Sequence, residues 1–86
     1  MEAYIRKLVQ DEIISYLMQE KDDPEAKQLS YEKSLYFISL HQKSINNIIN
    51  NIINENLICG KFIMPNIYEY IYSNEKFYEI MISACY

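Results

Sequence analysis

Amide and hydroxyl side chains alternate with isoleucines between residues 42 and 54, at a spacing that separates the two kinds onto opposite faces of a helix. The polar members are Gln42, Lys43, Ser44, Asn46, Asn47 and Asn50. Asn and Gln can pair bidentately with N6 and N7 of adenine, Ser can donate or accept, and Lys can reach guanine or phosphate. The pattern indicates either a surface that reads bases in A/T-containing DNA or a solvated face that is rich in Asn because the codons are A/T-rich.

Few other residues could support catalysis or hold a metal or cofactor. His41 is the one histidine, which argues against a metal cluster or a Ser/His/Asp site and favours a helix start or a phosphate contact. Gly60 is the one glycine, whereas Gly-rich phosphate loops need several. Cys59 and Cys85 form no C-x-x-C pair and are expected to be buried free thiols. We therefore expect no enzymatic activity, no cofactor and no metal site.

Length and charge indicate one small domain over residues 1–86, with a net charge of −4. Residues 26–64 carry four lysines against two glutamates, a net of +2, whereas residues 1–25 and 65–86 carry −4 and −2. The acidity thus lies outside the segment with the amide residues. No apolar run approaches the roughly 18 residues of a membrane span, so we expect a cytoplasmic protein with no membrane partner. Ile occurs 15 times and Asn 8 times, and both have A/T-rich codons. This bias suggests a phage, a plasmid or a low-GC bacterium.

The N-terminal segment, residues 1–22, predicts an amphipathic helix from about Ala3 to Glu20. Its apolar residues recur at helical spacing and are Ile5, Leu8, Val9, Ile13, Tyr16 and Leu17. After it, Asp23 can cap a helix that begins at Pro24, or Ser30 can cap one that begins later.

Residues 24–56 allow two interpretations. In one, apolar and polar residues spaced four and three apart form a heptad seam on a single helix of over thirty residues, with Tyr31, Leu35, Ile38, Gln42, Ile45, Ile49 and Ile52 on the seam. In the other, the chain breaks near Ser39-Leu40-His41, and a separate helix, residues 42–54, buries an isoleucine face. Asn is a poor helix former, so packing of that face must hold the helix.

The last third predicts a two-stranded hairpin followed by a helix. Leu57–Met64 is rich in β-forming residues, Pro65-Asn66 is a turn signal, and Tyr68, Tyr70 and Tyr72 alternate at period two. The rival interpretation is a helix that begins at Asn66 with a capping box to Glu69. We favour the hairpin over residues 57–72. Helical spacing of Phe77, Ile80, Met81, Ala84 and Cys85 then predicts a C-terminal helix over residues 73–86.

This order of elements, and the residues from Leu29 to Ile58, resemble the winged helix-turn-helix family of DNA-binding domains. Leu29-Ser30-Tyr31-Glu32-Lys33 resembles the start of its first motif helix, and His41-Gln42-Lys43-Ser44-Ile45 the start of its recognition helix. Glu55-Asn56-Leu57-Ile58 resembles the exit into the wing, with Asn56 expected to adopt the left-handed conformation in place of Gly. The resemblance implies a mainly α fold with a small β-hairpin (α+β), comprising three helices, a two-stranded wing and a C-terminal helix. The alternative fold is an all-α bundle.

The resemblance implies a homodimeric regulator of transcription or replication that binds double-stranded DNA. Its 42–54 helix would enter the major groove, with His41, Lys33 and Lys61 near phosphates. Flanking helices would supply the dimer interface, for which the candidates are Tyr4, Tyr16, Phe77, Ile80 and Met81. The alternative is that the aromatic rings of these helices complete the core of a small monomer. The alternative function is an acidic helical module that acts by protein contact alone, such as an immunity protein, an antitoxin-like inhibitor or a phage-encoded modulator.

Overall fold

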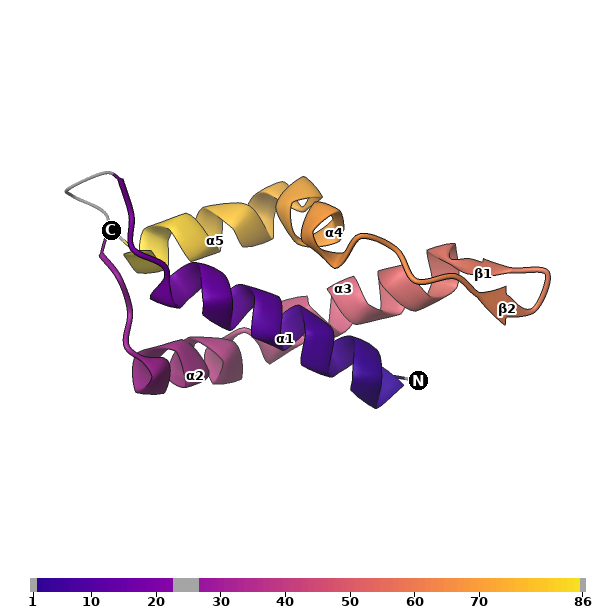
Figure 1. The fold of residues 1–86 in the computed structure, drawn as a ribbon, viewed down its shortest axis with the longest axis horizontal. Helices are drawn as coiled ribbons and strands as arrows, with labels where there is room; N and C mark the ends of the chain where they lie inside the picture. Colours follow the sequence, from indigo (N-terminus) through magenta and orange to yellow (C-terminus); the bar gives the residue numbers. More distant parts are fainter. Residues whose placement is uncertain (1, 23–26, 86) are drawn as a thin grey trace.

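The computed structural model describes residues 2–22 and 27–85, and in that part of the chain it contains helices and one short hairpin (Figure 1). In order, the elements are α1 (Glu2–Met18), α2 (Tyr31–Leu40), α3 (Gln42–Glu55), β1 (Leu57–Ile58), β2 (Lys61–Phe62), α4 (Ile67–Ser73) and α5 (Glu75–Cys85). The expected mainly helical fold with a small hairpin is confirmed, and the all-α alternative is wrong because β1 and β2 pair antiparallel. None of the described helices is long and apolar enough to cross a membrane.

Helix α1 lies between the other helices and contacts α2, α3, α4 and α5 (Figure 1). Ile5, Val9, Ile13 and Leu17 follow one another at intervals of four residues and are all 0% exposed. This spacing places them on one stripe of the helix, which the remaining elements cover. The predicted N-terminal helix is therefore confirmed to within two residues at each end.

Helices α2 and α3 meet at a bend of one residue, His41, which confirms the interpretation with two separate helices. The backbone N–H of His41 bonds to the carbonyls of Phe37 and Ile38, both at 3.2 Å, and the His41 carbonyl accepts from Ile45 N. Ser30 caps α2 by accepting from Lys33 N at 3.2 Å, as predicted. The other possible cap, Asp23-Pro24, lies outside the described residues.

The buried residues before and after the bend stay in helical phase. Ser34, Phe37 and Ile38 on α2 continue the stripe that α3 extends with its isoleucines. The heptad seam is wrong at its start because Tyr31 and Leu35, which it placed in the interior, are 56% and 42% exposed. Because of the bend, the buried stripes of α2 and α3 both pack against α1, whereas a single straight helix would diverge from the surface of α1.

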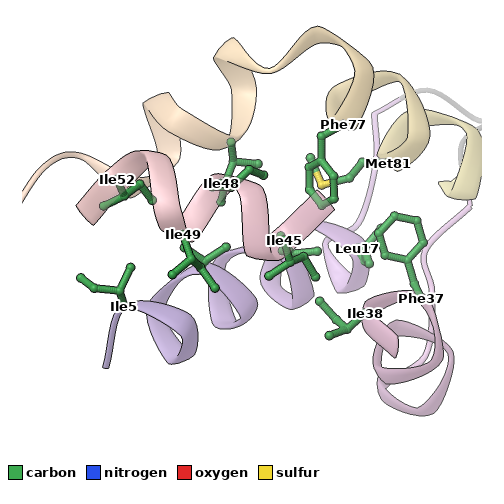
Figure 2. Close-up of a cluster of buried hydrophobic side chains, with 13 residues drawn as sticks. Ile5, Leu17, Phe37, Ile38, Ile45, Ile48, Ile49, Ile52, Phe77 and Met81 are labelled. Carbon is green, nitrogen blue, oxygen red and sulfur yellow. The ribbon is translucent and has the colours of Figure 1, made fainter. Parts of the chain in front are cut away.

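The core is assembled from side chains of all the helices (Figure 2). Ile45, Ile48, Ile49 and Ile52 of α3 face α1 and the C-terminal helices, with exposures of 2% or less. Phe77 of α5 meets Phe37 of α2 edge to face, with ring centroids 6.4 Å apart. Because these contacts join residues distant in sequence, the isoleucine face is held by tertiary packing rather than by the helix propensity of its asparagines.

The hairpin is shorter than predicted and turns at a different place. Leu57 pairs with Phe62 and Ile58 with Lys61, so Cys59 and Gly60 form a two-residue turn. Both turn residues have positive φ, 53° and 77°, as a type I′ hairpin turn requires. The expected turn at Pro65-Asn66 is wrong. The expected left-handed conformation of Asn56 is also wrong, since its φ is −111°.

Residues 67–73 form helix α4 rather than a second long strand, so the rival interpretation of a helix after Asn66 was correct, although Asn66 caps it through Tyr68 N and not through the predicted Glu69. The Asn66 side chain accepts from Tyr68 N at 3.1 Å and caps the helix. Ile67 and Ile71 lie four residues apart and turn toward the core, with Ile71 1% exposed. A strand would place Glu69 on the same face as Ile67 and Ile71, whereas the helix turns both isoleucines toward the core and leaves Glu69 exposed.

Cys59 occupies an unfavourable backbone conformation, and its side chain is exposed, which corrects the expected buried thiol. The side chain of Cys85 lies outside the described part of the chain. We expect Cys59→Asn to raise the free energy of unfolding by about 0.5–1 kcal/mol, because Asn tolerates positive φ and Asn-Gly suits this turn. Urea denaturation with Cys59→Ser as the control measures the effect. Equal stability of the two variants would contradict it.

Candidate nucleic-acid interface

Helix α3 has two faces of opposite character. Its isoleucines point into the core, as predicted, and the opposite face exposes Lys43, Asn46, Asn47, Asn50, Asn51 and Asn54. The face extends about 16 Å from Lys43 to Asn54 at 1.5 Å per residue. No hydrogen bond joins these asparagine side chains to any other residue that the structure describes. Five amides in a row are thus free to bind a partner.

Asn51 and Asn54 belong to this face although the sequence analysis did not select them. They lie four residues after Asn47 and Asn50, so they occupy the same side of the helix. Their helical spacing alone was sufficient to place them there. We call the six exposed residues from Lys43 to Asn54 the amide face.

Gln42 does not belong to the amide face. Its Oε1 accepts a hydrogen bond from Arg6 Nη1 at 3.3 Å, and its Nε2 donates to the carbonyl of Ile38 at 3.3 Å. Both ends of the amide are therefore engaged within the protein, where they join α3 to α1 and α2. Gln42 would have to give up these bonds to read a base.

His41 lies at the bend, with its ring stacked on that of Phe37 at a centroid distance of 4.2 Å. Nδ1 is 2.9 Å from the Phe37 carbonyl. A carbonyl can only accept, so Nδ1 carries the proton and Nε2 of the neutral ring is left as an acceptor. A phosphate contact from His41 therefore requires the doubly protonated ring, and its expected side-chain cap on α3 is absent among the described contacts.

The three predicted lysines are all exposed but are widely separated. Lys43 lies in the first turn of α3, Lys33 in the first turn of α2, and Lys61 on β2. Figure 1 shows α2 and the hairpin toward opposite ends of the molecule, whose longest dimension is 47 Å. Lys33 and Lys61 can contact phosphates of one duplex only if the duplex runs along this long axis. Ser44, the remaining predicted contact, is half-buried.

The charges around the amide face differ from those of α1. Residues 33–54 contain no acidic residue, and the acid that ends this stretch is Glu55. On α1, by contrast, the bases are paired with neighbouring acids, Arg6 with Glu2 at 3.3 Å and Lys7 with Asp11 at 2.9 Å. The hydrogen bond that Lys7 donates to Asp11 raises the pKa of Lys7. The amide face and its flanks are thus the part of the described surface best suited to approach a polyanion.

The predicted dimer residues do not form one surface. Phe77 and Met81 are 1% and 0% exposed, because α5 uses them to cover the protomer's own core. For these two the prediction is corrected. Tyr16 and Ile80 are partly buried against the same core, and Tyr4 is 58% exposed on α1. Helical spacing located the apolar face of α5 but could not say whether that face packs within the protomer or against a second one.

Exposed apolar side chains lie instead on α2 and around the hairpin. They are Tyr31, Leu35, Tyr36 and Leu40 on α2, and Leu57, Ile58, Ile63 and Met64 at or beside the strands. All are at least 42% exposed. Two regions of the described surface therefore offer apolar contact area outside the amide face.

No protein-family model, curated protein or solved structure matches this chain. The chemistry of the amide face and of the apolar surfaces beside it is therefore what indicates function.

Proposed function

We propose that this protein binds double-stranded DNA through the amide face of α3 and acts as a small sequence-specific regulator of transcription or replication. The observation that carries the proposal is the row of five exposed asparagines beside Lys43, none of them hydrogen-bonded to another described residue. The major groove is about 12 Å wide and admits an α-helix. A face about 16 Å long spans roughly five base pairs at 3.4 Å each.

The order of the elements supports this use of α3. A helix pair followed directly by a hairpin resembles a winged helix-turn-helix domain, in which the second helix reads bases and the wing contacts the backbone. Here Lys61 of β2 would be the wing's phosphate contact. The one-residue bend at His41 is tighter than the turns of three or four residues usual in helix-turn-helix motifs, so α2 would contact the duplex differently from its counterpart in that family.

Few positive charges are available for phosphate contacts, so the specificity of the proposed binding would rely on base contacts. Lys33, Lys43 and Lys61 can neutralise about three phosphates, so affinity should fall with salt with a slope near −3 in a double-logarithmic plot. Most of the discrimination would come from amide contacts with adenine edges. A homodimer would double both contributions on a palindromic site.

The direct test is a titration into a labelled pool of random A/T-biased duplexes at low and at near-physiological salt. Fluorescence anisotropy reports binding, and sequencing of the bound fraction reports preference. Salt-dependent binding that enriches a short motif is the expected result. Absence of binding at low salt would reject the proposal.

The double substitution Asn46→Ala and Asn47→Ala should remove base contacts while leaving the fold intact, since both side chains are exposed and Ala is the better helix former. Each lost bidentate contact should cost about 1–3 kcal/mol of discrimination against the wrong base. Competition between the enriched motif and a scrambled duplex measures this. An unchanged preference would show that these amides read no bases.

Lysine substitutions supply the matched control for that experiment. Lys43→Ala should weaken binding to all sequences alike and reduce the salt slope by about one. Lys27→Ala removes an exposed lysine in the segment before α2 and should change neither quantity. A salt slope that falls equally for both variants would indicate non-specific attraction.

A second candidate function is contact with another protein, without DNA. The exposed apolar residues of α2 and of the hairpin favour it, since exposed apolar patches on a small protein mark interaction sites. In this case the DNA titration fails at every salt concentration. Substitutions such as Leu40→Ser would then impair binding to the other protein, whereas substitutions on the amide face of α3 would have no effect on that binding.

A further inference from the structure

A small cavity lies between α1 and α4. These two helices contact each other across more than forty residues of sequence. Its volume is about 240 Å³, and it is lined by Glu12, Ser15, Tyr16, Gln19, Tyr68 and Tyr72. The α1 members follow a spacing of three and four residues, and Tyr68 and Tyr72 are four apart on α4. Each helix therefore contributes one continuous stripe, and we call the space the tyrosine cavity.

The rings that line the tyrosine cavity hold one another in place. Tyr72 meets Tyr16 edge to face with centroids 5.6 Å apart, and it lies against Tyr68 at 4.2 Å. Tyr78 of α5, which does not line the cavity, packs edge to face on Tyr72 with centroids 5.3 Å apart. Tyr72 thus contacts three rings from three helices.

The residues that line the tyrosine cavity carry one negative charge, and the ammonium of Lys21 lies beside them over the Tyr16 ring. Glu12 is the one ionisable carboxylate in the lining, and the lining contains no Lys, Arg or His. Burial raises the pKa of Tyr72 above its ordinary value, and Tyr68, Tyr16 and Glu12 raise it further. Tyr72 therefore remains a neutral phenol near pH 7, and Glu12 supplies the negative charge beside aromatic rings.

An ammonium group of the protein itself already lies over one of these rings. Lys21 Nζ lies 3.7 Å from the centroid of the Tyr16 ring and donates a hydrogen bond to the Tyr16 carbonyl. Lys21 is not one of the residues that line the cavity. A cation of the protein thus occupies one face of Tyr16, so a ligand in the cavity would use the rings of Tyr68 and Tyr72 together with Glu12.

We propose that the tyrosine cavity binds a small alkylammonium ion, either a free amine or the end of a lysine-like side chain. Tyrosine rings and a carboxylate together attract an organic cation, while Ser15 and Gln19 offer oxygens that accept its N–H groups. The cavity is smaller than the roughly 300–1,000 Å³ of pockets for drug-sized ligands, which suits an ion of a few heavy atoms. This site is separate from the amide face of α3 and does not depend on DNA binding.

The test is an NMR titration of the ¹⁵N-labelled protein with butylammonium chloride, with butanol as the neutral analogue at matched ionic strength. Saturable chemical-shift changes at the amides of Ser15, Gln19 and Tyr68 are expected with butylammonium and not with butanol. A parallel titration with Nα-acetyl-lysine N-methylamide distinguishes the two sources: binding of both supports a side chain as occupant, and binding of butylammonium alone supports a free amine.

Two substitutions and one control assign the binding to this cavity. Glu12→Gln removes the charge and Tyr68→Leu removes an exposed ring, and each should weaken the affinity about fivefold or more. Glu79→Gln removes a carboxylate of α5 that lines a different cavity, with Phe37 and His41, and should leave the affinity unchanged. The proposal is overturned if the shifts do not saturate, if butanol reproduces them, or if Glu12→Gln and Glu79→Gln behave alike.

Discussion

Ile49→Ala should lower the free energy of unfolding by about 2–5 kcal/mol, enough to leave a substantial fraction of a marginal domain unfolded. Ile49 is 0% exposed and lies on the inner face of α3. Its replacement leaves a cavity, and it removes part of the packing that keeps an asparagine-rich segment helical. Thermal and urea denaturation followed by circular dichroism at the helix minimum measure the loss.

The adjacent residue provides a matched control for this prediction. Asn50 is exposed on the amide face, and Asn50→Ala should be neutral or stabilise by a few tenths of a kcal/mol, because Ala is the better helix former. Similar losses from both substitutions would mean that α3 does not present the two faces described here. The pair therefore checks the orientation of α3 as well as its contribution to stability.

Phe77→Ala should destabilise the protein by about 3–5 kcal/mol. Phe77 is 1% exposed and packs edge to face on Phe37, so it joins α5 to α2 through the core. Phe77→Leu keeps most of the apolar volume and should cost less. Denaturation of both variants, with Tyr4→Ala as an exposed aromatic control, tests the burial.

The same variants distinguish a core residue from an interface residue. If Phe77 lay at a dimer interface, Phe77→Ala would yield a folded monomer, and wild-type stability would rise with protein concentration. With Phe77 inside the protomer, the loss is the same at every concentration. Analytical ultracentrifugation of the folded fraction of each variant separates the two outcomes.

Helices with one buried stripe were predictable because their apolar residues recur at a single period. The stripe of α1, the isoleucine face of α3 and the Ser30 cap all follow from local spacing and side-chain chemistry. The helical spacing on α5 was also correct. The surface that covers the apolar face of α5 was not predictable, because such a face has the same sequence pattern whether its own protomer or another one covers it.

The segment after α3 was harder because two periods overlap in it. Tyr68, Tyr70 and Tyr72 alternate like a strand, while the spacing of four residues between Ile67 and Ile71 fits either a strand or a helix. The cap from Asn66 and the burial of Ile71 against the rest of the core decide between them, and burial is a tertiary property. The tyrosine cavity was missed for the same reason, since it forms only where α1 and α4 pack together, which is also a tertiary property.

The continuous phase across His41 limits how this chain can change in length. One residue inserted at the bend would rotate α3 by about 100° relative to α2 and would turn part of its isoleucine face toward solvent. Residues 63–66, between β2 and α4, form no regular structure and could lengthen without rotating any buried stripe. Homologous sequences should therefore vary in length after the hairpin and keep a single residue between α2 and α3.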